Sequence, residues 1–430
     1  MFWRKKAKEK EKKPPGPPRP PELGFRDTVE SLTTAFVLAM VIRYFAVEAF
    51  KIPTRSMQPT LRGDPANGDR ILVNKFIYDL RPPKRWDVVV FKYPKEPYLN
   101  YIKRLVGLPG EKIQILDGNI VVNGKVARKP WRVQKDLFVP IMSREVLERV
   151  QEEGDVYPAG PRRAVTEGDL LGPRRWQPDN QTAWRGEEKE IAVDASGQTF
   201  LQYRGDIVAY GETEPPPGEP RDRPAPIPTG DLAISFSFTT SKTAGQLLAK
   251  IHDGNNRFFF HLPLDSSVPY VEYQLKKSGA GTFRGETSVP FRPSKRYKIH
   301  FINVDDTAAI RVNDAEVLHF EYDGGVREYE TNLPDRSVAL GVQSVSGTLS
   351  ELTLFRDIYY RRYSSYEDPE LGLRRRDYGI EPVLLGPEQL FVLGDNSPNS
   401  NDARVWGPLP RNKLLGEAFF VWFPRWKIIR

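Results

Sequence analysis

Short apolar runs separated by turn residues are the feature that most constrains the fold of this chain. From Gly230 onward the sequence contains runs such as LAISFSF, YKIHFINV and AAIRVN, and Gly, Pro, Asn or Asp stand between them. Successive side chains of a strand point to opposite faces, so such runs predict the half-buried strands of an antiparallel sandwich. The 39 prolines and 33 glycines of the 430 residues fit a mainly β fold with many turns.

Two further segments, residues 51–132 and 382–430, are also strand-like. In the first, Arg70–Val73, Trp86–Phe91 and Lys112–Ile115 are rich in β-branched residues, and helical periodicity is missing. The dipeptides Asp117-Gly118 and Asn123-Gly124 tolerate positive φ, which predicts tight hairpins. The second segment ends in the apolar run EAFFVWF. We expect the two segments to form one antiparallel β core.

The amino-terminal part predicts attachment to a membrane. Residues 1–28 form a basic, proline-rich tail, and residues 29–50 have about the length of a transmembrane helix. Cationic segments stay on the cytoplasmic side, so we expect a single-pass protein of the cytoplasmic membrane whose later residues lie on the outer, periplasmic side. Arg43 and Glu48 interrupt the apolar run, so a helix lying on the membrane surface and a cleaved export signal remain alternatives.

Charge and residue usage exclude several classes of function. The first 13 residues account for five of the eight net positive charges, so the rest of the chain need not have a basic face for nucleic acid. The absence of cysteine excludes disulfides, thiolate metal sites and a cysteine nucleophile. The four histidines fall in one central stretch without ligand spacing, and we interpret them as packing or surface residues. We expect no metal and no cofactor.

Three short motifs carry the candidate chemistry. They are the segment from Phe50 to Leu61 (FKIPTRSMQPTL), the segment from Tyr101 to Gly110 (YIKRLVGLPG) and the segment from Gly394 to Arg404 (GDNSPNSNDAR). A serine hydroxyl needs a base to become a nucleophile, and these segments contain no histidine to serve as that base. A lysine can replace it if burial keeps the amine neutral. We therefore predict that Lys103 is the general base for a nucleophilic Ser56.

The order of these motifs behind an amino-terminal anchor resembles the type I signal peptidases. The resemblance implies that the N–H of Ser56 and the hydroxyl of Thr54 form an oxyanion hole, and that Ser400 orients the lysine amine. It also implies that Asp402 and Arg404 form a supporting ion pair. Small substrate pockets are implied along a further set of residues, which are Phe50, Ile52, Met57, Leu61, Tyr101 and Ile102.

Some positions depart from common versions of the family motifs, and each motif alone has a simpler interpretation. Arg55, Asn100 and Ala403 differ from frequent family residues, which affects substrate preference more than the proton path. Taken alone, Ser56 could be a turn residue and Lys103 a solvated surface cation. Met57 fits core packing as well as a pocket wall.

A long insertion, residues 133–381, separates the lysine motif from the Gly-Asp-Asn motif. Its later half resembles concanavalin A-like jelly rolls, on phrases such as Tyr297–Phe301 and Ile310–Asp314. We favour a purely structural insertion, and binding of a glycan or envelope polymer is the alternative.

The fold class that we expect is therefore mainly β, with a signal-peptidase-type core behind one transmembrane helix and an inserted sandwich. The expected function is a membrane-bound serine endopeptidase that cleaves signal peptides from exported precursors after small residues (A-x-A). Its partners would be those precursors and the lipid bilayer. Two alternatives remain, a non-catalytic tethered binding protein and a self-cleaving Ser–Lys protease of the repressor type.

Overall fold

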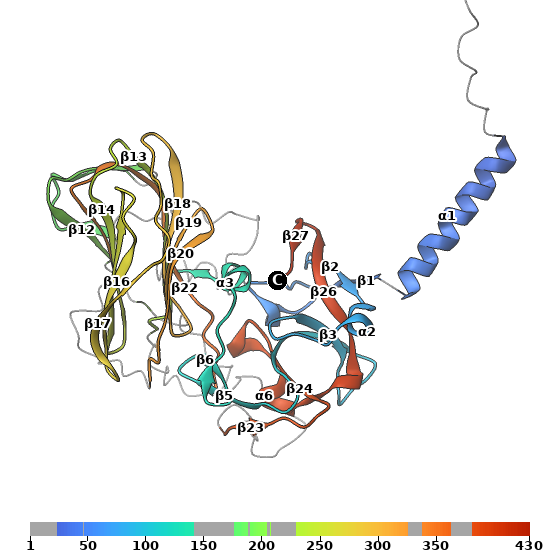
Figure 1. Cartoon of the computed structure of the whole chain (residues 1–430). Coiled ribbons are helices and arrows are strands. Elements are labelled where there is room, and N and C mark those ends of the chain that lie inside the picture. The colour runs from blue at the N-terminus through green and yellow to red at the C-terminus, as the bar shows by residue number, and fades with distance from the viewer. Residues whose placement is uncertain are drawn as a thin grey trace, which may run out of the picture.

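Antiparallel sheets make up most of the molecule in a computed structural model of the chain. The structure describes residues 24–45, 47–141, 176–187, 190–203, 207, 229–325, 338–362 and 381–430. Figure 1 shows one group of sheets on the left, a second group on the right and a single long helix at the far end. The prediction of a mainly β fold is confirmed.

The sheet on the right of Figure 1, here called the core sheet, combines strands from both ends of the chain. Its hydrogen-bonded order is β1-β2-β26-β3-β4-β24-β25, and β27 pairs with β26. The strand β26 lies between β2 and β3, so late residues complete a sheet that early residues begin. The strands are β1 (Val47–Lys51), β2 (Arg70–Asn74), β3 (Val88–Lys92), β4 (Asn100–Gly107), β24 (Gln389–Leu393), β25 (Leu409–Pro410), β26 (Leu414–Phe423) and β27 (Lys427–Ile428).

A small sheet of order β23-β5-β6-β7 lies below the core sheet in Figure 1. Its hairpins turn at the two predicted dipeptides, where Asp117, Gly118, Asn123 and Gly124 all have positive φ. The strands are β5 (Lys112–Leu116), β6 (Asn119–Val122), β7 (Lys125–Val126) and β23 (Val383–Leu384).

Two larger sheets face each other in the group on the left of Figure 1. The first, the β22 sheet, has the order β10-β11-β22-β13-β18-β19-β20, with β8 on β22. Its strands are β8 (Val139–Pro140), β10 (Trp184–Glu187), β11 (Glu190–Asp194), β13 (Leu232–Thr240), β18 (Arg296–Asn303), β19 (Thr307–Val312), β20 (Ala315–Glu321) and β22 (Ser346–Arg356). The second, the β15 sheet, has the order β17-β16-β15-β14-β21-β12-β9. Its strands are β9 (Trp176–Pro178), β12 (Gln198–Tyr203), β14 (Gln246–Asp253), β15 (Asn256–Pro263), β16 (Tyr270–Leu275), β17 (Gly279–Arg284) and β21 (Ala339–Gln343).

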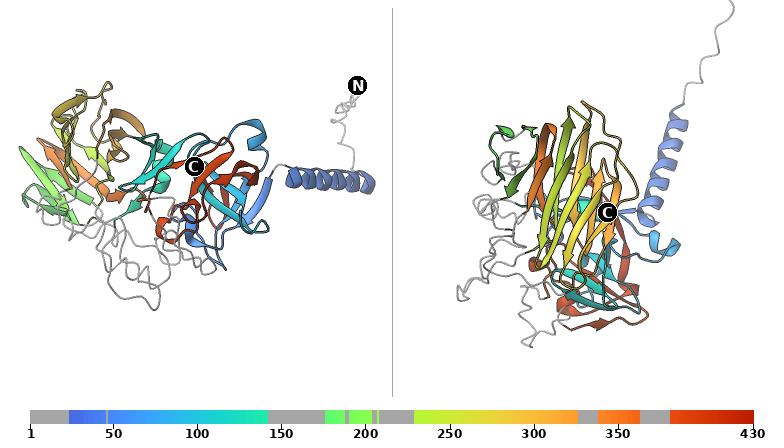
Figure 2. Two further views of the ribbon diagram at one scale, coloured as in Figure 1. Left: turned by 90° about the horizontal axis from the view of Figure 1, so that it is seen from below. Right: turned by 60° about the vertical axis from the view of Figure 1, so that its left-hand side comes forward.

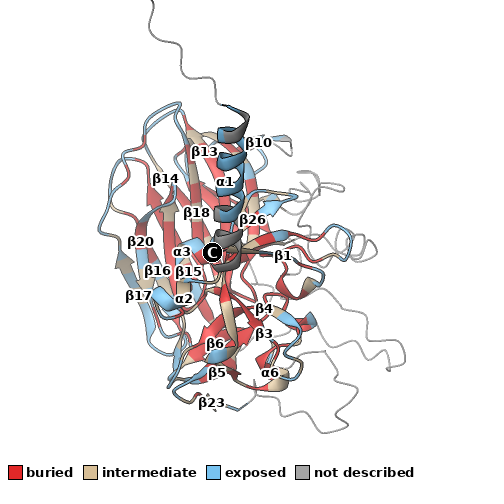
Figure 3. Ribbon diagram, turned by 90° about the vertical axis from the view of Figure 1, so that its right-hand side faces the viewer, coloured by how far each residue is buried: buried red, intermediate tan, exposed pale blue. Residues whose placement is uncertain are grey.

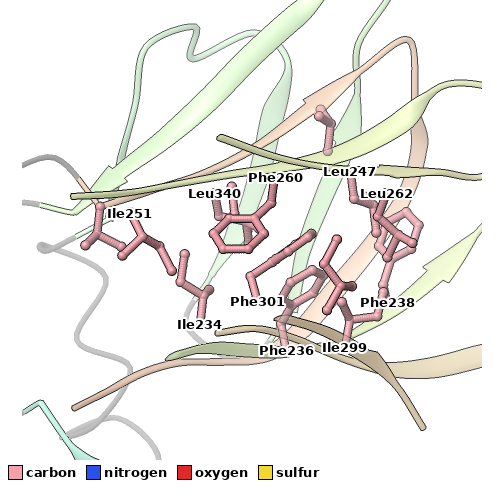
Figure 4. Close-up of a cluster of buried hydrophobic side chains, with 14 of the residues drawn as sticks. Ile234, Phe236, Phe238, Leu247, Ile251, Phe260, Leu262, Ile299, Phe301 and Leu340 are labelled. Carbon is pink, nitrogen blue, oxygen red and sulfur yellow. The ribbon is translucent and has the colours of Figure 1, made fainter. Parts of the chain in front are cut away.

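Alternate side chains of these two sheets form one apolar core between them. Figure 4 shows Phe236 and Phe301 of the β22 sheet pointing toward Phe260 and Leu340 of the β15 sheet. This interdigitation follows from the period-2 pattern of the sequence, because apolar residues occupy every second position from Leu232 to Phe238 and from Phe258 to Leu262. The closer assignment to a concanavalin A-like jelly roll remains a prediction.

The amino-terminal helix differs from the predicted one. Helix α1 covers Phe25–Phe45 rather than 29–50, because Val47–Lys51 form β1 and pair with β2. Within the described part of the chain, no helix combines the length and the apolar character needed to cross a bilayer. Figure 1 shows α1 standing clear of the sheets, and its residues Val29, Leu32 and Phe36 are coloured as exposed in Figure 3. Residues 1–23 of the basic tail lie outside the described residues.

The two legs that join the core to the inserted sheets pack more closely than a linker would. Helix α3 (Trp131–Leu137) follows β7, and its residues Val133 and Leu137 join the apolar cluster beneath the core sheet. After β22 the chain returns through Ile358 and Tyr360, which belong to the same cluster. Residues on both legs that the sequence assigned to the insertion therefore pack in the core. The remaining short helices are η1 (Arg55–Met57), α2 (Ile77–Leu80), η2 (Ser397–Asn399), α6 (Ala403–Trp406) and η3 (Arg411–Lys413).

Candidate active site

Ser56 lies in η1, a single helical turn directly after β1. Thr54 precedes the turn in an extended conformation, and the backbone of Arg55 accepts a hydrogen bond from Gln58 N–H. Gly63 packs against this entry so closely that a Cβ there would lie 1.6 Å from the Thr54 carbonyl oxygen. The Pro-Thr-Arg sequence and this tight packing hold Ser56 in a defined place, with most of its side chain buried.

Lys103 reaches Ser56 from β4, 47 residues along the chain. Its Nζ lies 2.8 Å from Ser56 Oγ and donates a second hydrogen bond of 2.9 Å to the carbonyl of Ile102. In β4, Lys103 pairs with Val89 of β3, and the Tyr101 ring lies 5.4 Å from the amine. The structure thus brings together the two residues that the sequence selected as nucleophile and base.

Burial controls the charge of this amine. Lys103 is only 4% exposed, and desolvation lowers its pKa from 10.5 to about 8. The carboxylates of Asp402 and Asp395 act in the opposite direction and raise this pKa, and Arg404 lowers it. A substantial fraction of Lys103 is therefore neutral near pH 8, and its lone pair can then accept the Ser56 proton.

Both carboxylates near the amine are already bound by arginine. Arg104 contacts Asp395 with Nε and a terminal nitrogen, each at 2.8 Å. Arg404 contacts Asp402 in the same way, at 2.9 and 2.7 Å. All four side chains are buried, and such bidentate pairs fix geometry as well as charge. The predicted ion pair of Asp402 and Arg404 is present, and the pair of Arg104 and Asp395 was missed.

The Gly-Asp-Asn motif holds the serine turn in place. Asn396 N–H donates to the Ser56 carbonyl at 3.0 Å, and Asn396 Nδ2 donates to the Arg55 carbonyl at 3.2 Å. Gly394 N–H donates to Asp402 at 3.0 Å. A Cβ on Gly394 would lie 2.2 Å from Ser400 Oγ and 2.5 Å from the Ser56 carbonyl oxygen, so only glycine fits here. Ser400 is buried beside the site, and its proposed role in orienting the amine stays a prediction.

The other predicted site residues divide into exposed and buried groups. Thr54 is exposed beside η1, where its hydroxyl makes no capping hydrogen bond. The predicted pocket residues Ile52, Met57 and Leu61 are buried in one apolar cluster, with Phe50 and Ile102 partly buried against it. Met57 and Leu61 have no exposed surface, which favours core packing for these two. Tyr101 stacks on Tyr93, with ring centroids 4.3 Å apart.

The arrangement suits nucleophilic chemistry at a carbonyl. It provides a hydroxyl, an amine of lowered pKa and backbone N–H groups at the start of a short turn. Among the described residues, no group of three or more His, Asp or Glu is placed to hold a metal ion.

Replacing Lys103 by methionine tests the burial of the amine without any assay of activity. In the unfolded chain the pKa of Lys103 returns to 10.5, whereas in the folded chain it is about 8. The unfolded state therefore binds more protons between these pH values, and the stability contributed by Lys103 rises with pH in that window. We expect Lys103→Met to unfold at a higher temperature than the parent at pH 7, with the advantage shrinking as the pH approaches 10.

The exposed Lys125 of β7 provides the control for this measurement. Lys125→Met should show no such pH-dependent difference from the parent. If Lys103→Met unfolded at a lower temperature than the parent at pH 7, the amine would be favourably paired in its charged form.

Comparison with known proteins agrees with this geometry. The chain is 43% identical over 110 residues to "Signal peptidase I" of Pseudomonas aeruginosa, which covers 23% of this chain and 37% of that protein. It is 39% identical over 112 residues to "Probable signal peptidase I-2" of Synechocystis, which covers 25% of this chain and 50% of that protein. The chain thus spans half or less of the length of these two relatives.

Solved structures give weaker likenesses. The carbohydrate binding module CBM66 from Bacillus subtilis covers 42% of this chain and 94% of its own, with 14% identity and a TM-score of 0.28. The galectin LEC-6 from Caenorhabditis elegans covers 30% of this chain and 82% of its own, with 12% identity and a TM-score of 0.20. Likenesses at this level support no conclusion about ligand or activity.

The family comparison is decisive because it covers more than half of the chain. The model described as "Signal peptidase, peptidase S26" matches residues 25–171 and 341–423. These ranges contain Ser56, Lys103 and the whole Gly-Asp-Asn motif. The chain belongs to the signal peptidase family, peptidase S26.

Proposed function

We propose that this chain is a serine endopeptidase that removes signal peptides from exported precursors, cutting after small residues in A-x-A sequences. The observation that carries the proposal is the 2.8 Å contact between a buried lysine amine and the Ser56 hydroxyl. Membership of the peptidase S26 family supports it.

In the proposed reaction, neutral Lys103 takes the Ser56 proton as Oγ attacks the scissile carbonyl carbon. The N–H of Ser56 and the hydroxyl of Thr54 stabilise the oxyanion. The C–N bond then breaks, and Lys103 returns the proton to the leaving amine, which leaves an ester on Ser56. Lys103 next deprotonates a water molecule, which hydrolyses this ester and releases the processed signal peptide.

The start of β4 offers a place for an extended substrate. Pairing between β4 and β24 begins at Arg104, so among the described residues Asn100–Lys103 have a partner strand on the β3 side alone. A precursor could add as an extra strand on the side of this segment opposite β3, which would direct alternate side chains toward the apolar cluster of Phe50, Ile52 and Ile102.

Two competing functions explain less of the site. A non-catalytic tethered binding protein gives no reason to bury a lysine at a cost in stability. A self-cleaving protease of the repressor type would need a scissile segment of its own chain at Ser56. In the described residues, the hydrogen bonds to Ser56 come from Lys103 and from Asn396.

Cleavage of a precursor with an A-x-A site tests the proposal directly. Ser56→Ala should abolish cleavage and Lys103→Ala should reduce the rate by about 10³-fold or more, since nucleophile and base act as a unit. In the parent, the rate should fall as the pH drops below about 8, because Lys103 becomes protonated. A parent rate that stayed flat from pH 9 to pH 6, or equal cleavage by all three proteins, would refute the assignment.

We also propose that α1 attaches the enzyme to the cytoplasmic membrane, with the basic tail inside and the core sheet on the outer side. The exposed apolar residues Val29, Leu32, Phe36 and Val37 of α1 support the attachment. Helix α1 leads within two residues into β1, which ends just before the serine turn. The active site would therefore lie close to the membrane surface, where the apolar segment of a precursor is held.

Fractionation of bacterial cells tests this attachment. The chain should sediment with membranes and resist extraction with alkaline carbonate, and external protease should reach it in spheroplasts. Replacing Leu32 and Phe36 together by glutamine should release it. Recovery of the parent in the soluble fraction would contradict the proposal.

A second candidate function, carbohydrate binding, is favoured by the outer face of the β15 sheet. The side chains of Phe259 and Tyr270 flank His261, with centroid distances of 4.2 Å to each. Arg284 lies over the Tyr270 ring, and Lys250 lies over Phe259. Flat rings with nearby cations suit a sugar chain that carries acidic groups.

Binding of an acidic polysaccharide such as alginate, compared with neutral dextran, tests this face. We expect the protein to bind alginate and not dextran. Phe259→Ala or Arg284→Gln should weaken the affinity for alginate by roughly tenfold, as expected for the loss of one good contact. Lys277→Gln, which removes an exposed cation of the neighbouring turn, is the control. Equal binding by all variants would exclude this surface.

A further inference from the structure

The segment Asp357–Arg361, here called the return segment, links the inserted sheets to the active-site loop. It starts at the end of β22, where Asp357 N–H donates to the carbonyl of Asp231, just before β13, at 2.9 Å. Three residues later it lies in the core, where Tyr360 is buried and its N–H donates to the carbonyl of Gly118 of the small sheet at 3.0 Å. In Figure 1 and in the left view of Figure 2 the inserted sheets lie on the side of the core sheet away from α1.

The return segment contacts the loop that supports Ser56. The hydroxyl of Tyr360 donates to Asp395 at 3.4 Å. The N–H of Arg361 donates to Ser397 Oγ at 2.8 Å, and the Arg361 carbonyl accepts from Arg404 at 2.9 Å. Asp395 is the carboxylate that Arg104 binds, and Arg404 is the arginine that binds Asp402. The return segment therefore contacts both buried ion pairs of the site.

The opposite end of the return segment is fixed by a buried junction of one cation and two carboxylates. Lys129, on the outgoing leg, contacts Asp305 at 2.5 Å and Asp357 at 2.8 Å. All three side chains are buried, and burial raises the pKa of Asp357 to about 6. Losing one partner of such a group leaves a buried charge, so the junction resists separation of the two legs.

We infer that Tyr360 and Arg361 are positioning residues of the Ser–Lys site, acting through Asp395, Ser397 and Arg404. The inference rests on the proposed function, and it makes the insertion part of the catalytic core. Displacing the return segment would loosen the loop of residues 394–404 and admit water to Lys103. The rate at saturating substrate should then fall more than the affinity for the precursor.

Gly118 allows the return segment to be displaced without changing any residue of the site. A Cβ on Gly118 would lie 2.3 Å from the ring of Tyr359, so Gly118→Ala must displace Tyr359, and we expect the segment that carries it to shift. Gly124, in the next hairpin, has nearly the same positive φ but nothing within 4 Å of its Cβ position. Gly124→Ala therefore has the same backbone strain without the clash, and it is a matched control.

We expect Gly118→Ala to lower kcat on the order of tenfold to a hundredfold, as small misplacements of reacting groups do, with KM changed less. The acid limb of its pH–rate profile should shift to higher pH, because a less buried Lys103 holds its proton more strongly. Gly124→Ala should stay within about twofold of the parent, since nothing at the site moves. Equal losses in both alanine variants, or a folded Gly118→Ala with unchanged kcat and profile, would overturn the inference.

If Gly118→Ala does not fold, Tyr360→Phe tests the positioning role instead, because this variant keeps the ring and loses only the hydroxyl that contacts Asp395. It should lower kcat severalfold and shift the acid limb in the same direction, and an unchanged profile would overturn the role of Tyr360. If the parent cleaves no precursor, the proposed function fails. The positioning role is then tested by the melting temperatures of the parent and of Lys103→Met, measured across a range of pH. In the Gly118→Ala background, the pH at which the difference between them begins to shrink should be higher.

Discussion

A lysine amine held inside the protein beside a serine hydroxyl sets the requirements for the rest of the structure. Burial lowers the pKa of Lys103, but Asp395 and Asp402 lie near enough to raise it again. Each carboxylate is bound by a buried arginine, so the site contains charges without offering Lys103 a free anion. The loop that carries both carboxylates also holds the serine turn through Asn396. Charge balance and geometry are therefore maintained by the same few residues.

Much of this site could be predicted from the sequence, because the chemistry requires particular residue types in fixed motifs. Ser56 and Lys103 were identified without a structure, and the structure places them in contact. The extents of the elements were less predictable. Val47–Lys51 continue an apolar run that reads as helix, but pairing with β2 makes them a strand. Met57 and Leu61 fit a pocket by motif, yet packing from β2 and β26 buries them completely. Such outcomes depend on contacts between distant segments.

The insertion was predicted as strands but not as part of the core. The turn chemistry of Asp117-Gly118 indicated a hairpin, and nothing local indicated that Gly118 also makes room for Tyr359. The Lys129 junction was equally hidden, because its two carboxylates lie far from it in the sequence. Residues 357–361 carry no recognisable motif, and their importance appears once their contacts with Ser397 and Arg404 are seen. An insertion can thus be continuous in sequence and still share its final residues with the domain it interrupts.

The position of β26 between β2 and β3 has a consequence for the biosynthesis of the protein. As the chain leaves the ribosome, β2 can pair with β1 and β3 with β4, but neither can yet pair with β26, the neighbour that they share. The inserted strands β14 to β17 and β18 to β20 pair with their neighbours in sequence and can fold before β26 is made, as modules with local contacts do. The serine turn acquires its supporting loop only when the last strands arrive. On the proposed function, a nascent chain would therefore stay inactive until residues 394–404 and β26 have been synthesised.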